Sequence, residues 1–154
     1  MGNLVIAVAL GSNLGDRESL LGLARSRLRL LLTDVRSSSS YETAPVGVGG
    51  HQPFFLNAAV VGITPLPARG VLKALHSIER EAGRERLVPG AARTLDLDLV
   101  LYGDEIITEP GLVVPHPRFR ERRFVLEPLS EIAPDLRDPV TGKTVDELLR
   151  ILTG

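Results

Sequence analysis

Apolar residues recur along the chain with two different periods, and each period predicts a different element. Short runs rich in valine, isoleucine and phenylalanine, or with alternating leucines, predict strands. Apolar positions three and four residues apart predict amphipathic helices. We therefore expect strands at 3–10, 35–43, 54–63 and 93–101, main helices at 16–32 and 67–83, and shorter helices at 124–132 and 145–152.

Turn and cap residues separate these segments. A turn rich in glycine, 11–15, follows the first strand, and Asp16 behind it is the expected N-cap of the first helix. Gly83 is expected to end the second helix. Three prolines lie within 109–123, which we expect to be a loop.

The predicted order is strand, helix, strand, strand, helix, strand. This is the order of the split βαβ, or ferredoxin-like, fold of the α+β class. It predicts an antiparallel sheet with both main helices packed on one face and the opposite face open for a site. With 154 residues, we expect one domain that spans the whole chain, 1–154.

Composition narrows the function classes. A net charge of -1 argues against a nucleic-acid-binding protein that relies on a basic field. The absence of cysteine excludes thiol catalysis and cysteine zinc sites. No stretch resembles a signal peptide or a membrane span, so we expect a cytoplasmic protein without a membrane partner.

The strongest candidate for chemistry is the sequence Arg-Thr-Leu-Asp-Leu-Asp-Leu-Val-Leu at 93–101. Its leucines fall on one face of a strand, and Asp96 and Asp98 fall together on the other. Two residues along a strand span about 6.5–7 Å, so both carboxylates can reach one cation or a close pair. The alternative is that both aspartates only face water.

Further candidates flank this strand. Glu79 lies on the edge of the apolar stripe of the second helix, and His116 lies between two prolines. Arginines supply 16 of the 18 basic residues, so bound phosphates would be contacted mainly by guanidinium groups. The alternatives are an ordinary ion pair for Glu79, a solvated loop for His116 and solvated arginines.

The third strand opens with two adjacent aromatic residues, Phe54 and Phe55, which point to opposite faces. One of them could stack on a flat ring, and Asn57 could hydrogen-bond with the polar edges of that ring. Both aromatic residues could equally belong to the core.

Taken together, these segments resemble 6-hydroxymethyl-7,8-dihydropterin pyrophosphokinases, which act in folate biosynthesis. The likeness covers almost the whole chain, and its most specific motifs are Arg-Thr-Leu-Asp-Leu-Asp at 93–98 and Val-Pro-His-Pro at 114–117. It also includes the segments at 9–15 (ALGSNLG), 41–47 (YETAPVG), 52–60 (QPFFLNAAV), 78–79 (IE), 83–84 (GR) and 122–124 (RRF).

The resemblance implies transfer of pyrophosphate from ATP to the pterin, release of AMP, and two Mg²⁺ ions held by Asp96 and Asp98. It implies a monomer whose partners are ATP and the pterin. Catalytic roles would fall to the two aspartates and to Arg84 and Arg93. The residues expected near ATP are Glu79, Arg84, Arg93, His116 and Arg122, and those expected near the pterin are Thr43, Pro45, Val46, Phe55, Asn57 and Phe124.

Two other classes compete with this interpretation. A catalytically inactive ferredoxin-like module could bind a nucleotide or a partner protein. Such a module would be expected to lose a carboxylate or a phosphate-binding arginine, whereas this chain has both kinds of residue. A small RNA-binding domain is disfavoured by the near-neutral charge and the acidic strand.

Overall fold

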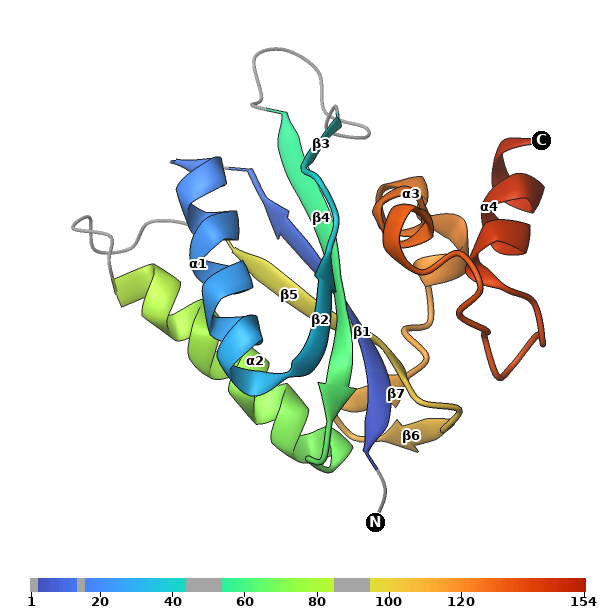
Figure 1. Cartoon of the computed structure of the whole chain (residues 1–154), viewed down its shortest axis with the longest axis horizontal. Coiled ribbons are helices and arrows are strands. Elements are labelled where there is room, and N and C mark those ends of the chain that lie inside the picture. Colours follow the sequence, from blue (N-terminus) through green and yellow to red (C-terminus); the bar gives the residue numbers. More distant parts are fainter. Residues whose placement is uncertain (1–2, 14–15, 44–53, 85–94) are drawn as a thin grey trace.

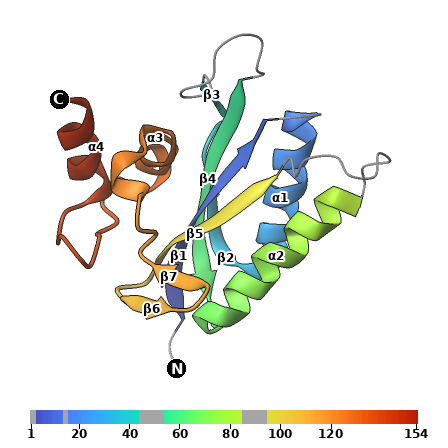
Figure 2. The same ribbon diagram turned by 180° about the vertical axis from the view of Figure 1, so that it is seen from behind.

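A central antiparallel sheet divides the molecule into two layers of helices (Figures 1 and 2). The computed structural model describes residues 3–13, 16–43, 54–84 and 95–154. The five strands of the sheet are β1 (Leu4–Ser12), β2 (Thr33–Ser37), β3 (Tyr41–Thr43), β4 (Phe55–Thr64) and β5 (Asp96–Tyr102). The helices are α1 (Arg17–Leu31), α2 (Ala68–Arg84), α3 (Arg123–Ile132) and α4 (Val145–Thr153).

The strand order is β2-β4-β1-β5, with β3 also paired to β4. All pairings in the sheet are antiparallel. This order and the two helices after β1 and β4 confirm the predicted α+β fold. Strand β5 therefore lies at an edge of the sheet, next to the long central strand β1.

One face of the sheet packs against α1 and α2 (Figure 1). Leu21, Leu28 and Leu75 are fully buried there, as their helical spacing predicts. The carboxylate of Asp16 accepts a hydrogen bond from the Ser19 N–H at 3.1 Å, which confirms the predicted N-cap. Helix α2 continues through Gly83 and ends one residue later.

The opposite face is not open, contrary to the sequence expectation. Helices α3 and α4 cover much of it, and a second apolar cluster forms around Val61, Phe119 and Leu126. Both ribbon views place α3 and α4 across the sheet from α1 and α2 (Figures 1 and 2). Helix α4 begins with a capping box, in which Thr144 and Glu147 bond each other's backbone N–H groups. Among the described residues, a cavity on this face lies between Phe55 of β4, the start of β5 and α3.

Two local expectations also need correction. The predicted strand 35–43 is two strands, β2 and β3, separated by residues 38–40. The predicted loop 109–123 contains strand β7 (Leu112–Val114) and a short 3₁₀ helix, η1 (Phe119–Glu121). Strand β7 forms a hairpin with β6 (Ile107–Glu109), which ends where the predicted loop begins. Residues 115–118 remain irregular and connect β7 to η1.

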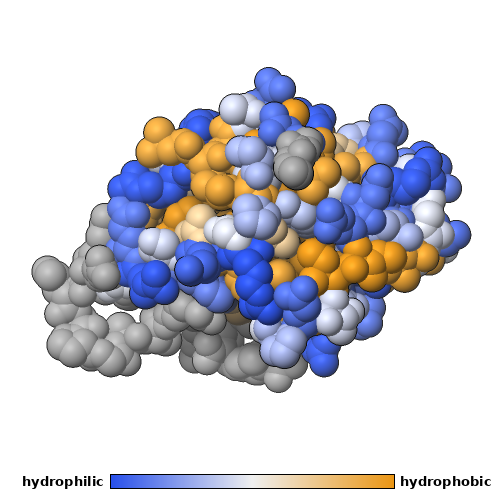
Figure 3. All heavy atoms as spheres, turned by 90° about the horizontal axis from the view of Figure 1, so that it is seen from below, coloured by the Kyte–Doolittle hydropathy of each residue, from blue (hydrophilic) through white to orange (hydrophobic). Residues whose placement is uncertain are grey.

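On the face seen from below, apolar patches lie among hydrophilic residues (Figure 3). The most exposed large apolar residues lie on separate elements, among them Leu30 on α1, Ile106 before β6 and Ile151 on α4. None of the helices in the described ranges is both long and apolar enough to cross a bilayer.

Candidate active site

Three neighbouring strands place a polar residue, a glycine and a carboxylate side by side. Gly11 on β1 pairs with Asn57 on β4 and with Asp96 on β5. One step along the strands, Ala9 pairs with Ala59 and with Asp98. Small residues on β1 therefore leave open space between the amide of Asn57 and the two carboxylates.

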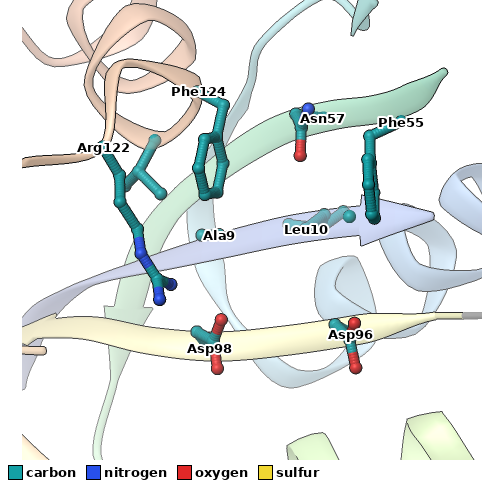
Figure 4. A pocket seen from close by; sticks show the side chains of 10 residues that line it. Ala9, Leu10, Phe55, Asn57, Asp96, Asp98, Arg122 and Phe124 are labelled. Carbon is teal, nitrogen blue, oxygen red and sulfur yellow. The ribbon is translucent and has the colours of Figure 1, made fainter. Parts of the chain in front are cut away.

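This open space is a cavity of about 220 Å³, lined by residues of β1, β4, β5 and α3. Phe55 on β4 and Phe124 on α3 stand on opposite sides of it, with Asn57 between them (Figure 4). Ala9 and Gly11 lie at its floor, and Asp96 and Asp98 line the side formed by β5. Aromatic rings on opposite sides of a cavity suit a flat ring held by stacking.

A second cavity, of about 330 Å³, lies beyond the outer edge of β5. Helix α2 contributes His76 and Glu79 to its wall, and the segment after β7 contributes His116 and Pro117. Asp96 and Asp98 line this cavity as well. The two aspartates are thus shared between the cavities, and a ligand in either one can approach them.

The alternation predicted for β5 is confirmed from Leu95 to Leu99. Leu101 departs from it: a register shift between β1 and β5 turns this side chain into the cluster of Phe119 and Leu126 on the opposite face. Leu95, Leu97 and Leu99 are at most 5% exposed, whereas Asp96 and Asp98 are exposed. Because leucine burial fixes the register of the strand, both carboxylates must point away from the α1–α2 core. Two carboxylate oxygens on one exposed face suit a hard divalent cation such as Mg²⁺.

These two carboxylates fit a metal site that a substrate completes. Within the described ranges, no group of three or more histidine, cysteine, aspartate or glutamate side chains is arranged to hold a metal ion. Mg²⁺ usually keeps several waters and is held by one or two carboxylates together with substrate phosphates. Asp96 and Asp98 are a donor set of that kind.

Glu79 is buried and bonded to the backbone of the same strand. Its side chain is 9% exposed, and Oε2 accepts a hydrogen bond from the Leu97 N–H at 2.8 Å. The N–H of an edge strand that points away from its neighbour needs such a partner. Glu79 therefore joins α2 to β5 between the two aspartates, where it also borders the second cavity.

His116 is half-buried and faces the same pair of carboxylates. Burial lowers the pKa of its imidazole below 6.5, the negative charge of Asp98 opposes this change, and Arg122 and Arg118 reinforce it. The Arg118 N–H donates to Nδ1 at 3.2 Å, which assigns the proton of the neutral ring to Nε2. His116 is therefore a neutral hydrogen-bond donor at pH 7.

Arg122 lies in the first cavity, at the start of α3. Its guanidinium carbon is 5.5 Å from the centroid of the Phe124 ring, within cation–π range. Figure 4 shows the side chain extending from α3 toward Asp98. This arrangement places a fixed positive charge beside the aspartates, where a phosphate group would need one.

Thr43 acts on the site through Asn57. The Asn57 amide Nδ2 donates to Thr43 Oγ1 at 2.7 Å, so the amide oxygen is oriented over Gly11. Pro45, Val46 and Arg93 lie outside the described residues. Arg84 is the last residue of α2, and its side chain is also outside the described part of the chain.

Sequence reasoning missed several cavity residues. His76 precedes Glu79 by three residues, so it shares a helix face with that carboxylate, and this spacing could have identified it. Gly11 was assigned only to a turn, although it is a paired residue of β1. Its role depends on its neighbours in the sheet, which no local pattern predicts.

Comparisons with known proteins agree with this fold and site. The sequence matches the family of 7,8-dihydro-6-hydroxymethylpterin-pyrophosphokinases over residues 7–134. A Bacillus subtilis protein named 2-amino-4-hydroxy-6-hydroxymethyldihydropteridine pyrophosphokinase is 43% identical over 147 residues, which cover 94% of this chain and 87% of that protein. A protein of the same name from Pseudomonas aeruginosa is 42% identical over 146 residues, covering 94% of this chain and 89% of the relative.

A crystal structure of Plasmodium falciparum HPPK-DHPS has the same fold, with a TM-score of 0.77 and 14% sequence identity. The superposition covers 97% of this chain and 45% of the Plasmodium chain, so this chain spans less than half of that protein. The fold and the site define a ferredoxin-like protein with a carboxylate pair between two cavities. By its sequence, the chain belongs to the 6-hydroxymethyl-7,8-dihydropterin pyrophosphokinase family.

Proposed function

We propose that this protein transfers the pyrophosphoryl group of ATP to the hydroxymethyl oxygen of 6-hydroxymethyl-7,8-dihydropterin and releases AMP. The observation that carries this proposal is that Asp96 and Asp98 line both cavities. A transfer between two bound molecules requires the donor and the acceptor to meet at one point. The shared aspartates are that point.

The cavity between Phe55 and Phe124 is assigned to the pterin. Its two rings can stack on the flat bicyclic ring, and the Asn57 amide oxygen can accept a hydrogen bond from the polar edge of that ring. We assign backbone groups of residues 43–46 to the same ring on the basis of the family resemblance. In this orientation the hydroxymethyl group faces the aspartates.

The cavity beyond β5 is assigned to ATP. Glu79 and His116 border it, and the Nε2–H of the neutral histidine can donate to a phosphate or to a base. Arg122 supplies positive charge on the other side of the aspartates. We assign Arg84 and Arg93 to the phosphates from the family motif, as bidentate donors.

In the proposed reaction, the pterin hydroxyl oxygen attacks the β-phosphorus of ATP. A bond forms between these two atoms, the bond from the β-phosphorus to the α,β-bridging oxygen breaks, and AMP leaves. The hydroxyl proton passes to solvent or to a nearby carboxylate. The aspartates and Arg122 contribute by positioning the two reacting groups, and guanidinium groups offset charge on the phosphoryl oxygens.

Two Mg²⁺ ions are proposed to bind Asp96 and Asp98 together with the phosphate oxygens. Without a cation, the two carboxylates would repel a polyphosphate held beside them. Mg²⁺ held by these two aspartates would neutralise this charge and that of the pyrophosphoryl group being transferred. This accounts for an acidic strand in a protein that binds polyanions.

The test is AMP formation from ATP and Mg²⁺, measured with and without 6-hydroxymethyl-7,8-dihydropterin. We expect AMP only with the pterin, in equal amount to the pterin diphosphate, and no turnover when EDTA removes Mg²⁺. ADP in place of AMP would contradict pyrophosphoryl transfer. ATP binding without turnover would instead favour an inactive nucleotide-binding module.

A further inference from the structure

Asp138, in the segment between α3 and α4, is a buried carboxylate with a complete set of hydrogen bonds. Its side chain is 0% exposed. It accepts from Arg120 Nε at 2.5 Å and Nη2 at 3.0 Å, from the Val140 N–H at 3.0 Å and from Thr141 Oγ1 at 2.7 Å. The contact with Arg120 is therefore bidentate, which fixes the plane of the guanidinium group.

Arg120 also contacts an aromatic ring. Its guanidinium carbon lies 4.9 Å from the centroid of Phe119, which is itself fully buried in the α3–α4 cluster. The cation thus contacts both an apolar ring and a buried carboxylate. This arrangement ties the short helix η1 to the segment that begins at Asp138.

The tied helix lies between two residues of the active site. His116 borders the second cavity, three residues before η1, and Arg122 borders the first cavity, directly after it. The Phe119 N–H donates to the His116 carbonyl at 3.3 Å, and the Arg122 N–H donates to the Phe119 carbonyl at 3.2 Å. A displacement of η1 would therefore move Arg122, because Arg122 follows η1 directly and its N–H is hydrogen-bonded to Phe119 of that helix.

We propose that Asp138 is a positioning residue for Arg122, acting through Arg120 and η1; the proposal rests on the function proposed above. Asp138 touches neither cavity, so it acts only by holding the turn in place. The family match ends at residue 134, and Asp138 lies four residues beyond that point. The inference thus gives the C-terminal segment of this chain a part in building the site.

The ionisation of Asp138 supports this role. Burial alone would raise the pKa of its carboxyl, but the hydrogen bonds from Arg120, Thr141 and Val140 lower it below the ordinary value. The group is therefore charged at neutral pH and attracts Arg120, whose side chain is 25% exposed. Removing the Asp138 charge leaves Arg120 without its bidentate partner and free to turn toward water, which favours movement of the turn.

The first test compares Asp138→Asn with the unaltered chain in the pterin-dependent AMP assay, well below the melting temperature. The matched control is Asp146→Asn, which removes a carboxylate from the solvent-facing Arg150–Asp146 pair on α4. We expect kcat/KM to fall about tenfold in Asp138→Asn, because small displacements of a positioned group are costly. The control should keep its full activity.

The decisive comparison repeats Asp138→Asn in an Arg122→Ala background. If Asp138 acts through Arg122, Asp138→Asn should lower kcat/KM by less than about twofold in the Arg122→Ala background. The reason is that two substitutions acting through one residue are not additive. An equal loss in both backgrounds would overturn the proposal, because it would indicate a general loss of structure. If Asp138→Asn does not fold, Arg120→Lys, which keeps the charge but not the bidentate contact, takes its place.

Amide hydrogen exchange gives a readout that does not depend on activity. The Arg122 and Leu126 N–H groups bond within the turn and the first turn of α3, and we expect the Arg122 amide to exchange about tenfold faster in Asp138→Asn. Unchanged exchange at Arg122 would contradict the proposal even if AMP formation fell. A protein that makes no AMP would refute the proposed function, and exchange would still decide this inference.

Discussion

Asn57 and Asp96 lie on either side of Gly11, each paired with it from a different strand. The glycine therefore separates the amide assigned to the pterin from a carboxylate assigned to the metal. A Cβ atom at position 11 would lie 3.3 Å from Asn57 Oδ1, closer than most real contacts. The absence of a side chain at Gly11 keeps the floor of the first cavity open.

Gly11→Ala should therefore impair pterin binding more than catalysis. We expect the KM for the pterin to rise about tenfold while the KM for ATP stays within about twofold, because a methyl group in a filled site costs about 1–3 kcal/mol. Steady-state kinetics with each substrate varied in turn would measure both constants. An equal rise in both would contradict the assignment of this cavity.

Gly22→Ala is the matched control for that substitution. Gly22 lies in α1, and a Cβ atom there would meet nothing within 4 Å. Alanine favours a helix over glycine by about 1 kcal/mol, so this variant should melt slightly higher and keep its kinetic constants.

Asp96→Asn and Asp98→Asn should each abolish turnover while the fold remains. Loss of a metal-binding carboxylate removes several kcal/mol of stabilisation, which corresponds to a rate at least about a thousandfold lower. Asp104→Asn, in the exposed turn after β5, is the control. Rates and circular dichroism spectra together would check this, and an active Asp98→Asn enzyme would exclude the proposed metal role.

Glu79 should contribute to stability through its bond to the Leu97 N–H. Glu79→Leu removes the acceptor and leaves a buried donor unpaired, so we expect unfolding free energy to fall by about 1–3 kcal/mol. Glu79→Gln retains an acceptor oxygen and should lose clearly less. Urea unfolding of the three proteins at pH 7 would measure the difference, and equal losses would show that this hydrogen bond does not matter.

The Asp138 carboxyl should make stability depend on pH. Its pKa in the folded protein lies below the ordinary 3.8, so it binds a proton less readily when folded than when unfolded. Its contribution is therefore fully present above about pH 5 and is lost as pH falls through 3.8 toward the folded pKa. Urea unfolding at several pH values should show that the stability advantage over Asp138→Asn shrinks in acid; a constant difference would contradict this.

The strand and helix periods of the sequence predicted the sheet, both main helices and the face on which the two aspartates lie. The alternating leucines at 95, 97 and 99 predicted the orientation of β5, because their burial leaves only one face of the strand for Asp96 and Asp98. Glu79 was placed correctly at the border of the apolar stripe of α2. Its bond to Leu97 joins residues 18 positions apart and has no local signature.

The covering of the second face by α3 and α4 could not be predicted from the sequence. The period of these helices shows that each has an apolar side but not which surface that side contacts. The β6–β7 hairpin was missed because strands of three residues are too short to show a period. The hairpin turns at Pro110-Gly111, where Gly111 adopts φ 75°, a conformation that side chains disfavour.

The position of β5 at the edge of the sheet has a consequence for solubility. An edge strand with unpaired N–H and C=O groups can recruit a strand from another molecule and start aggregation. Here Glu79 accepts a hydrogen bond from the Leu97 N–H, and the His116 N–H donates one to the Val100 carbonyl at 2.9 Å. Asp96 and Asp98 add charge to the same strand, as residues that guard against aggregation do. We therefore expect the groups of the candidate active site to hinder self-association as well, so variants at these positions should be checked for self-association before a loss of activity is attributed to chemistry.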